Sequence, residues 1–226
     1  MITVKKNAIK YKSSDGTMKD SGVLCQVGTF GVNWLNYATN WQSIFDEMDF
    51  SSLNELPIFE YGSYFKGNMQ YAFRSTKNIE TIKIIGSKEI PIKLYSTFYG
   101  SDVKIIDLTE CSNVFSEIQQ SFRYCSALEE IWGVLDITNV STVNALFFSA
   151  NLLKEVRFRN QCIKLSLSLA NSKDLSDASI ESFVNGFADM TGQTAIVFTV
   201  HKDVKARIEA NPIWLATLTS KNVTLA

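Results

Sequence analysis

The chain has 226 residues, 46% of them hydrophobic, and its 22 Lys and Arg nearly balance its 23 Asp and Glu to give a net charge of −1. This balance argues against a nucleic-acid-binding protein, which usually carries a basic excess, and against electrostatic attachment to an anionic membrane surface. No apolar run approaches the ~20 residues of a membrane-spanning helix, and the N-terminal residues lack the apolar segment of a signal peptide.

Residues 1–66 are expected to form an N-terminal hairpin and a capping helix. Apolar residues spaced as in a strand flank residues 13–16, where Asp-Gly is a strong turn signal. Aromatic and apolar residues at i, i+3, i+4 and i+7 then predict an amphipathic helix over residues 33–48, with Asn33 as its N-cap. The aromatic stripe of this helix would pack on the core or receive a partner, and core is the more common role.

One pattern recurs through residues 67–180. The template has an apolar residue, a Phe four positions later, an apolar residue six after that, and two more three and five further on. The second copy lacks one residue after Phe98, and the third has Gly133 in place of its last apolar residue. The aromatic positions, 25, 24 and 25 residues apart, are Phe73, Phe98, Phe122 and Phe147. A fifth, eroded copy begins at Leu165. A fixed period in the twenties is typical of a solenoid, whose units stack to bury one continuous core. The end of each copy alternates as a strand does, and its start suits a single helical turn.

Residues 121–131, Ser-Phe-Arg-Tyr-Cys-Ser-Ala-Leu-Glu-Glu-Ile, resemble the A-F-x-x-C-x-x-L-x-x-I core of the BspA-type leucine-rich repeats of bacterial surface antigens. Ala72-Phe73 opens a second match. The resemblance covers about half of the chain and departs from the family in lacking the usual Ile-Pro after the strand, except at Ile90-Pro91. It implies a non-enzymatic binder on a bacterial surface, or a phage or prophage structural protein with similar repeats.

The tail, residues 181–226, changes pattern. A helix is expected from about Asp177 to the Thr191-Gly192 stop, followed by a strand over 194–200. A second helix over 204–210 would end before Pro212, and residues 222–225 would form a last strand. We therefore expect a mixed α/β fold: a short leucine-rich-repeat solenoid of about five copies, with an N-terminal β-hairpin and helix cap and an α/β C-terminal cap.

No catalytic constellation is visible. His201, the one histidine, has no Ser or Cys partner that the sequence identifies, and residues 28–31 lack the spacing and Lys of a phosphate loop. The acidic residues at 46, 47 and 49 lack the Gly and later Glu of an EF-hand loop. The four cysteines form no C-x-x-C pair: Cys25, Cys111, Cys125 and Cys162. Cys125 occupies a position where the other copies carry small residues, which suits a buried thiol. We expect no enzyme, no cofactor and no metal.

Binding is instead expected on the outward side of the repeat strands. One residue lies between the last two apolar positions of each strand: Lys83, Asp107, Trp132 and Arg157. Exposed Trp and Arg are enriched in binding hot spots, so this ladder is the predicted site unless Trp132 is buried by a neighbouring segment.

The function expected is recognition of a protein or glycan by a repeat-built surface, in a phage or prophage tail-type protein. The alternative is a bacterial cell-surface adhesin for host or matrix proteins, and a hydrolase with an unrecognised site is a distant third. These predictions place the protein in a virion or on a bacterial surface. They include no nucleic-acid partner, no membrane insertion and a possible homo-oligomer.

Overall fold

The computed structural model describes residues 10–12, 18–20, 38–51 and 58–226. Strands β1 (Lys10–Lys12) and β2 (Met18–Asp20) pair in antiparallel register. This is the pairing that the sequence led us to expect on either side of the Asp-Gly turn. The rest of the described chain is organised around a parallel sheet.

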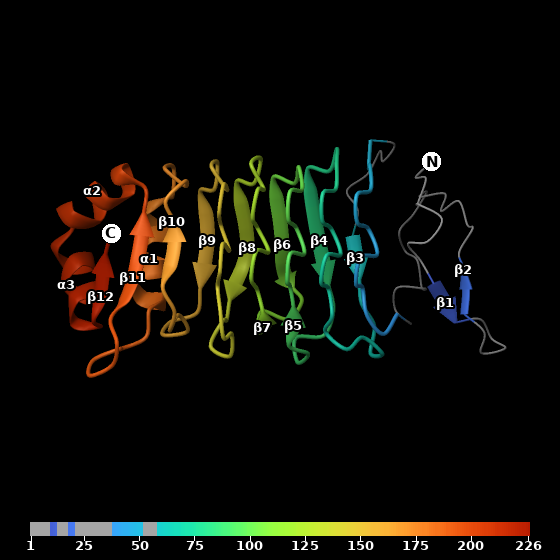
Figure 1. The fold of residues 1–226 in the computed structure, drawn as a ribbon, viewed down its shortest axis with the longest axis horizontal. Helices are drawn as coiled ribbons and strands as arrows, with labels where there is room; N and C mark the ends of the chain where they lie inside the picture. The colour runs from blue at the N-terminus through green and yellow to red at the C-terminus, as the bar shows by residue number, and fades with distance from the viewer. Residues whose placement is uncertain (1–9, 13–17, 21–37, 52–57) are drawn as a thin grey trace.

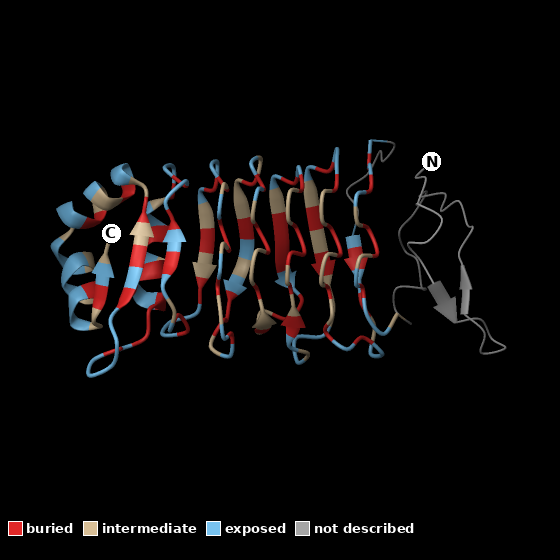
Figure 2. Cartoon of the chain, in the orientation of Figure 1, coloured by how far each residue is buried: buried red, intermediate tan, exposed pale blue. Residues whose placement is uncertain are grey.

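The main sheet is parallel throughout and stacks along the long axis of Figure 1. In spatial order its strands are β3 (Ile58–Glu60), β4 (Thr81–Ile85), β6 (Ile105–Glu110), β8 (Glu130–Leu135) and β9 (Glu155–Phe158). Ile82 pairs with Ile106, and Ile106 with Ile131, so the chain returns to the neighbouring strand after one sequence period. Alternate residues of β4 are buried, as the strand periodicity predicts (Figure 2).

A second wall, formed by segments that we call turn rows, faces the sheet across the core. The turn rows span residues 42–47, 70–75, 95–100, 119–124 and 144–149. Within each row, two residues four positions apart have positive φ, as Gln120 (+56°) and Tyr124 (+59°) do. The N–H groups of alternate residues donate to carbonyls of the next row; those of Phe98 and Phe122 donate to Ser121 (3.0 Å) and Leu146 (3.1 Å). Each of the first four rows therefore donates toward the C-terminal end of the molecule.

The repeat phenylalanines form one stacked column between the two walls. Ring centroids of Phe73 and Phe98 are 5.5 Å apart, those of Phe98 and Phe122 5.7 Å, and those of Phe122 and Phe147 5.5 Å. All four are buried, and their planes differ by 11° at most. One sequence period thus advances the chain by one strand of the sheet, and the buried rings fill the space between the two walls. Short strands β5 (Ile92–Lys93) and β7 (Phe115–Glu117) pair in the segments that lead from the sheet to the turn rows.

The C-terminal part ends the stack with a different arrangement. Strands β10 (Leu167–Leu169), β11 (Ile196–Val200) and β12 (Val223–Leu225) form a parallel sheet. The helices of the described chain all lie here: α1 (Asp177–Gly186), α2 (Lys202–Ala210) and α3 (Pro212–Ser220). Ser176 caps α1 by accepting the N–H of Ser179, and α1 packs against β9.

The predicted fold class, a leucine-rich-repeat solenoid of about five copies, is wrong. The structure is a parallel-sheet α/β fold. The predicted fifth copy folds as β10 followed by α1, because the Ser176 cap starts a helix where the pattern called for a strand. Nor does the start of each copy form the expected helical turn, since positive-φ residues interrupt it in every turn row.

The helix predicted over residues 33–48 is also wrong in its described part. Residues 38–48 contain no helix; residues 42–47 form the first turn row, and residues 33–37 lie outside the described residues. Trp41 and Phe45 are buried, and Phe45 stacks on Phe73 at 5.1 Å, so they belong to the core. The i, i+4 spacing of helical residues is shared by a turn row, and hydrogen bonds to the next row decide between the two.

Candidate functional site

The predicted binding residues lie on the outward side of the main sheet, which we call the sheet face. Lys83 pairs in register with Asp107, and Asp107 with Trp132, so these three side chains form one row across β4, β6 and β8. Arg157 does not continue the row, because a register shift sets it opposite Val134. The structure thus brings three of the four predicted residues together.

A glycine lies within the shifted segment. Gly133 follows Trp132 with φ of +109°, a conformation that L side chains rarely adopt, and a Cβ there would lie 3.2 Å from the carbonyl carbon of Leu108. Between Glu130 and Val134 the register shifts by two residues, so that Val134 rather than Trp132 lies opposite Arg157.

Polar groups on the sheet face are engaged with one another. Lys83 Nζ lies 3.6 Å from Asp107 Oδ2 and also pairs with Glu110, which raises the pKa of Lys83. Asp107 is buried, and its Oδ1 accepts the N–H of Thr109 at 3.0 Å. The charges within these ion pairs offset one another, and few hydrogen-bonding groups are left over for a ligand.

Trp132 is exposed, so the alternative that a neighbouring segment buries it is wrong. Its indole Nε1 donates to Glu130 at 2.6 Å, and Arg157 pairs with Glu155 at 3.1 Å. The ring offers contact area to a ligand, but both polar ends already have partners.

The opposite side of the molecule carries an aromatic surface that the sequence reasoning missed. We call it the turn face and define it by Tyr99, Arg123, Tyr124 and Phe148. The rings of Tyr99 and Tyr124 meet edge to face at 5.4 Å, and those of Tyr124 and Phe148 at 5.5 Å. Tyr124 is 41% and Phe148 47% exposed, so two large rings face solvent side by side. The available signal was an aromatic residue one or two positions after three of the four repeat phenylalanines, Phe98, Phe122 and Phe147.

Arg123 lies among these rings. Its guanidinium carbon is 4.8 Å from the centroid of Tyr124, 5.4 Å from that of Phe148 and 5.8 Å from that of Tyr99. It donates to Gln120 Oε1 at 3.4 Å and to the Tyr124 hydroxyl at 3.2 Å. Among the described residues it has no carboxylate partner, whereas Arg74 in an earlier row pairs with Asp46 at 2.5 Å. The cation of Arg123 is therefore held by ring faces and stays available to an acceptor.

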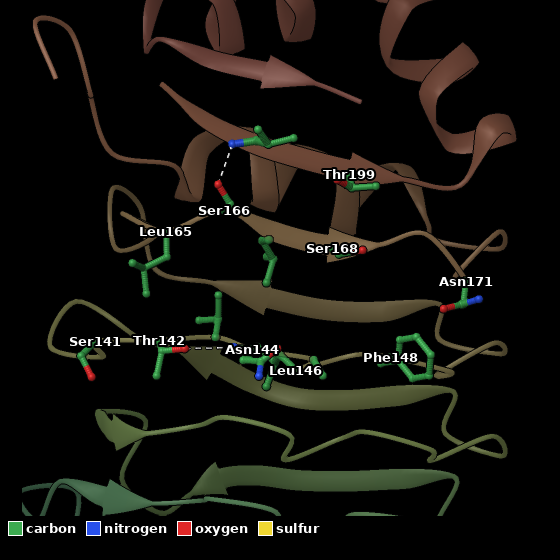
Figure 3. A pocket seen from close by; sticks show the side chains of 14 residues that line it. Ser141, Thr142, Asn144, Leu146, Phe148, Leu165, Ser166, Ser168, Asn171 and Thr199 are labelled. Carbon is green, nitrogen blue, oxygen red and sulfur yellow. Dashed lines mark hydrogen bonds between the residues drawn. The ribbon is translucent and has the colours of Figure 1, made fainter. Parts of the chain in front are cut away.

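The turn face leads into a groove, the end groove, between the last turn row and β10 (Figure 3). Its volume is about 400 Å³. Phe148 and Asn171 lie at one end of it in Figure 3, with Ser168 and Thr199 on the strands above the row. The lining combines apolar side chains with hydroxyls and amides and contains no charged side chain.

The groove forms because a strand follows a turn row. In the earlier rows the N–H groups of alternate residues all donate to the next row, as Gln120 donates to Asn144 O at 3.0 Å. In the last row only Ser149 does so, to the side chain of Asn171 at 3.3 Å. The N–H groups of Ala145 and Phe147 have no acceptor within the described chain. β10 thus leaves the backbone edge of the last row partly open.

Other chemistry on the described residues is structural. The thiols of Cys111, Cys125 and Cys162 are buried, and burial raises the pKa of Cys111 and of Cys125 to about 12, which disfavours the reactive thiolate. Cys25 lies outside the described residues. His201 caps α2, its Nδ1 accepting the N–H of Asp203 at 3.3 Å. The described side chains include no group of three His, Cys, Asp or Glu placed to hold a metal ion.

The acidic residues near the first turn row serve neighbouring rows. Asp46 pairs with Arg74, and Asp49 accepts from Asn78 at 2.9 Å. The hydrogen bond from Asn78 is the main cause of the lowered pKa of Asp49. They are therefore cross-row contacts rather than the solvated end of a helix.

The comparisons with protein-family models, with curated proteins and with solved structures find no match to the chain. The resemblance to surface-antigen repeats, and the setting that it implies, stay predictions. No helix among the residues that the structure describes is both long and apolar enough to cross a membrane.

Proposed function

We propose that this protein is a non-enzymatic recognition protein and that the turn face is its ligand-contacting surface. The observation that carries the proposal is Arg123, a cation with no carboxylate partner among the described residues, held within 6 Å of three aromatic rings, two of them exposed. Arg and Tyr are enriched among the residues that dominate binding energy. Tyrosine also gives a large contact area at a low cost in conformational entropy.

The turn face supports binding better than the sheet face does. On the sheet face Lys83 and the Trp132 indole are already bonded to neighbouring carboxylates. On the turn face Arg123 hydrogen-bonds two neutral groups, Gln120 and Tyr124, and its Nε is buried without a partner among the described residues. A ligand that brings an acceptor to Arg123 and an apolar face to Tyr124 would satisfy both.

The ligand class that fits this surface is a protein or a glycan. Both present acceptor oxygens beside apolar patches. The biological setting, a phage or prophage tail-type protein or a bacterial surface adhesin, rests on the resemblance of residues 121–131 to surface-antigen repeats. An enzymatic role has less support, because no nucleophile and base come together on the sites described above.

The test is binding of the labelled protein to a panel of bacterial cells, host epithelial cells, matrix proteins and immobilised glycans. Arg123→Gln is the informative variant, because it keeps a polar side chain of similar length but removes the cation. We expect the variant to lose at least about tenfold in affinity for any ligand that the wild type binds.

Thermal melting of Arg123→Gln separates a binding defect from misfolding, and Lys83→Gln on the sheet face is the matched control. Equal binding by wild type and Arg123→Gln, with loss in Lys83→Gln, would overturn the assignment to the turn face. Strain-specific binding to bacteria would support the phage-type setting, and binding to host cells or matrix would support the adhesin.

A further inference from the structure

The end groove has the dimensions of a small-ligand site. Its volume of about 400 Å³ falls in the range of such sites, and it adjoins the exposed ring of Phe148. It requires an explanation of its own, because the same wall is closed by row-to-row hydrogen bonds everywhere else along the stack.

Backbone donors are left over on one wall of the groove. Ala145 lines it, has a positive φ of +50°, and occupies the row position at which Gln120 donates its N–H to the next row. A row with this conformation aims its alternate N–H groups the same way. The N–H of Ala145 therefore points to the β10 side with no described acceptor, and a bound ligand can supply one.

Side-chain hydrogen bonds also leave donors for a ligand. Ser166 Oγ accepts the N–H of Val197 at 2.9 Å, so its hydroxyl hydrogen is free to donate. Asn171 Oδ1 accepts the N–H of Ser149 at 3.3 Å, which leaves the amide NH₂ of Asn171 for another partner. Each donor is thus oriented by an internal bond before any ligand arrives.

We propose that the end groove binds a neutral, hydroxyl-rich saccharide. A sugar ring has apolar C–H faces, which can pack on Phe148, and a rim of hydroxyls that both donate and accept. The groove matches this with apolar side chains, serine and threonine hydroxyls, amides and the N–H of Ala145. Ser168 and Thr199, which project from neighbouring strands, add hydroxyls on the far wall (Figure 3).

Two other ligand classes fit less well. A charged ligand would find no opposite charge, since none of the lining side chains is ionisable. An extended peptide cannot run along the whole row, because the walls are bridged at one end. There Ser172 Oγ donates to Ala150 O at 2.9 Å, and Ser149 bonds to Asn171. A compact saccharide of a few units needs no such passage.

The proposal deepens the proposed function by naming a ligand class, but it rests on the groove and shares only Phe148 with the turn face. The experiment is titration of the ¹⁵N-labelled full chain with a panel of neutral di- to tetrasaccharides, read by ¹H–¹⁵N NMR and calorimetry. We expect at least one saccharide to bind and to move the amide signal of Ala145 among the largest shifts. Ser168→Phe, which fills the groove from an exposed strand position, should weaken that binding by at least about tenfold.

The controls decide between the possible failures. Ser63→Phe places the same ring at an exposed serine outside the groove and should leave binding within about twofold of the wild type. Binding that survives Arg123→Gln but not Ser168→Phe supports the groove even if the turn face is wrong. No binding of any saccharide in the panel, or binding unchanged by Ser168→Phe, overturns the proposal. So does capture of a peptide that shifts Ala145 while the saccharides do not.

Discussion

The stack ends in two backbone edges, β9 on the sheet side and the last turn row, residues 144–149, on the turn side. The C-terminal part covers these two edges differently. On the sheet side, α1 closes the edge of β9: Ser179 Oγ accepts the N–H of Val156 at 3.0 Å, and Ser182 Oγ accepts that of Phe158 at 2.8 Å. On the turn side, β10 leaves the N–H groups of Ala145 and Phe147 without described acceptors.

This contrast shows how the C-terminal part can end the stacked strands on one side and leave a groove for a ligand on the other. An open sheet edge invites pairing with another chain, and serine hydroxyls at helical spacing remove that hazard on the β9 side. Within the described chain, side-chain hydrogen bonds bridge the turn side at Ser149 and Ala150, and the rest of the row faces a groove. The closed edge maintains the fold, and the open edge is where we place saccharide binding.

The largest expected effect comes from the aromatic column that supports both edges. Phe122→Ala removes a fully buried ring between Phe98 and Phe147 and should cost about 3–5 kcal/mol in the free energy of unfolding. Urea denaturation followed by circular dichroism measures it. Tyr124→Ala, an exposed ring two residues away, is the control and should cost much less. Equal losses in the two variants would mean that the column does not carry the fold.

The closed edge is tested next. Ser179→Ala removes the hydroxyl that bonds both the N–H of Val156 and the carbonyl of Lys154. The free energy of unfolding should fall by about 1–3 kcal/mol. The matched variant on the open edge is Ser168→Ala, which should change stability by about 0.5 kcal/mol or less because Ser168 is exposed. If the two substitutions lower the free energy of unfolding equally, the closed and open edges do not differ in this way.

A pH-dependent contribution is expected beside the closed edge. Burial opposes ionisation of Asp136, but hydrogen bonds from Thr138 and Arg159 outweigh it and lower the pKa of this carboxyl. A lowered pKa stabilises the fold above the pKa of an unfolded Asp, about 3.9, and the stabilisation is lost as pH falls through the lower, folded value. Asp136→Asn should therefore cost about 1 kcal/mol at pH 7 and less below pH 3.9.

Denaturant unfolding of wild type and Asp136→Asn at pH 7 and near pH 3 checks this expectation. The exposed Arg159 should contribute less than the Thr138 hydrogen bonds, so Arg159→Gln should be the milder change. If the difference in free energy of unfolding between wild type and Asp136→Asn is larger near pH 3 than at pH 7, the carboxylate of Asp136 does not stabilise the fold in this way.

The smallest expected effect is at the mouth of the groove. Asn171→Ala removes the acceptor of the Ser149 N–H, but both residues are partly or fully exposed and water can replace the amide. Stability should fall by less than about 1 kcal/mol, while saccharide affinity falls by more. A large loss of stability here would show that the turn-side edge is closed by this contact after all.

The spacing of apolar residues in the sequence predicted those parts of the fold in which buried residues recur at regular intervals. The spacing of Phe73, Phe98, Phe122 and Phe147 corresponds to the stacked column, and the alternating strand ends of the first four copies lie in the main sheet. The predicted start of the first C-terminal helix near Asp177 also agrees, but the helix ends at Gly186, before the predicted Thr191-Gly192 stop.

The errors arose where contacts distant in sequence decide the conformation. Gln120 and Tyr124 are not glycine, yet hydrogen bonds between rows hold them at positive φ, so the helical-turn expectation failed. A register shift in the segment that contains Gly133, a residue with positive φ, sets Arg157 outside the predicted row. The end groove was invisible in the sequence, because it exists only where β10 follows a turn row.

The most direct test of the central claim compares two exposed aromatic residues on opposite faces. Tyr124 on the turn face is 41% exposed and Trp132 on the sheet face 42%, so Tyr124→Ala and Trp132→Ala remove similarly accessible rings. We would measure the affinity of both variants for the tightest ligand found in the binding panel. Our account predicts at least about a tenfold loss for Tyr124→Ala and about twofold or less for Trp132→Ala. The reverse order would place recognition on the sheet face and contradict the account.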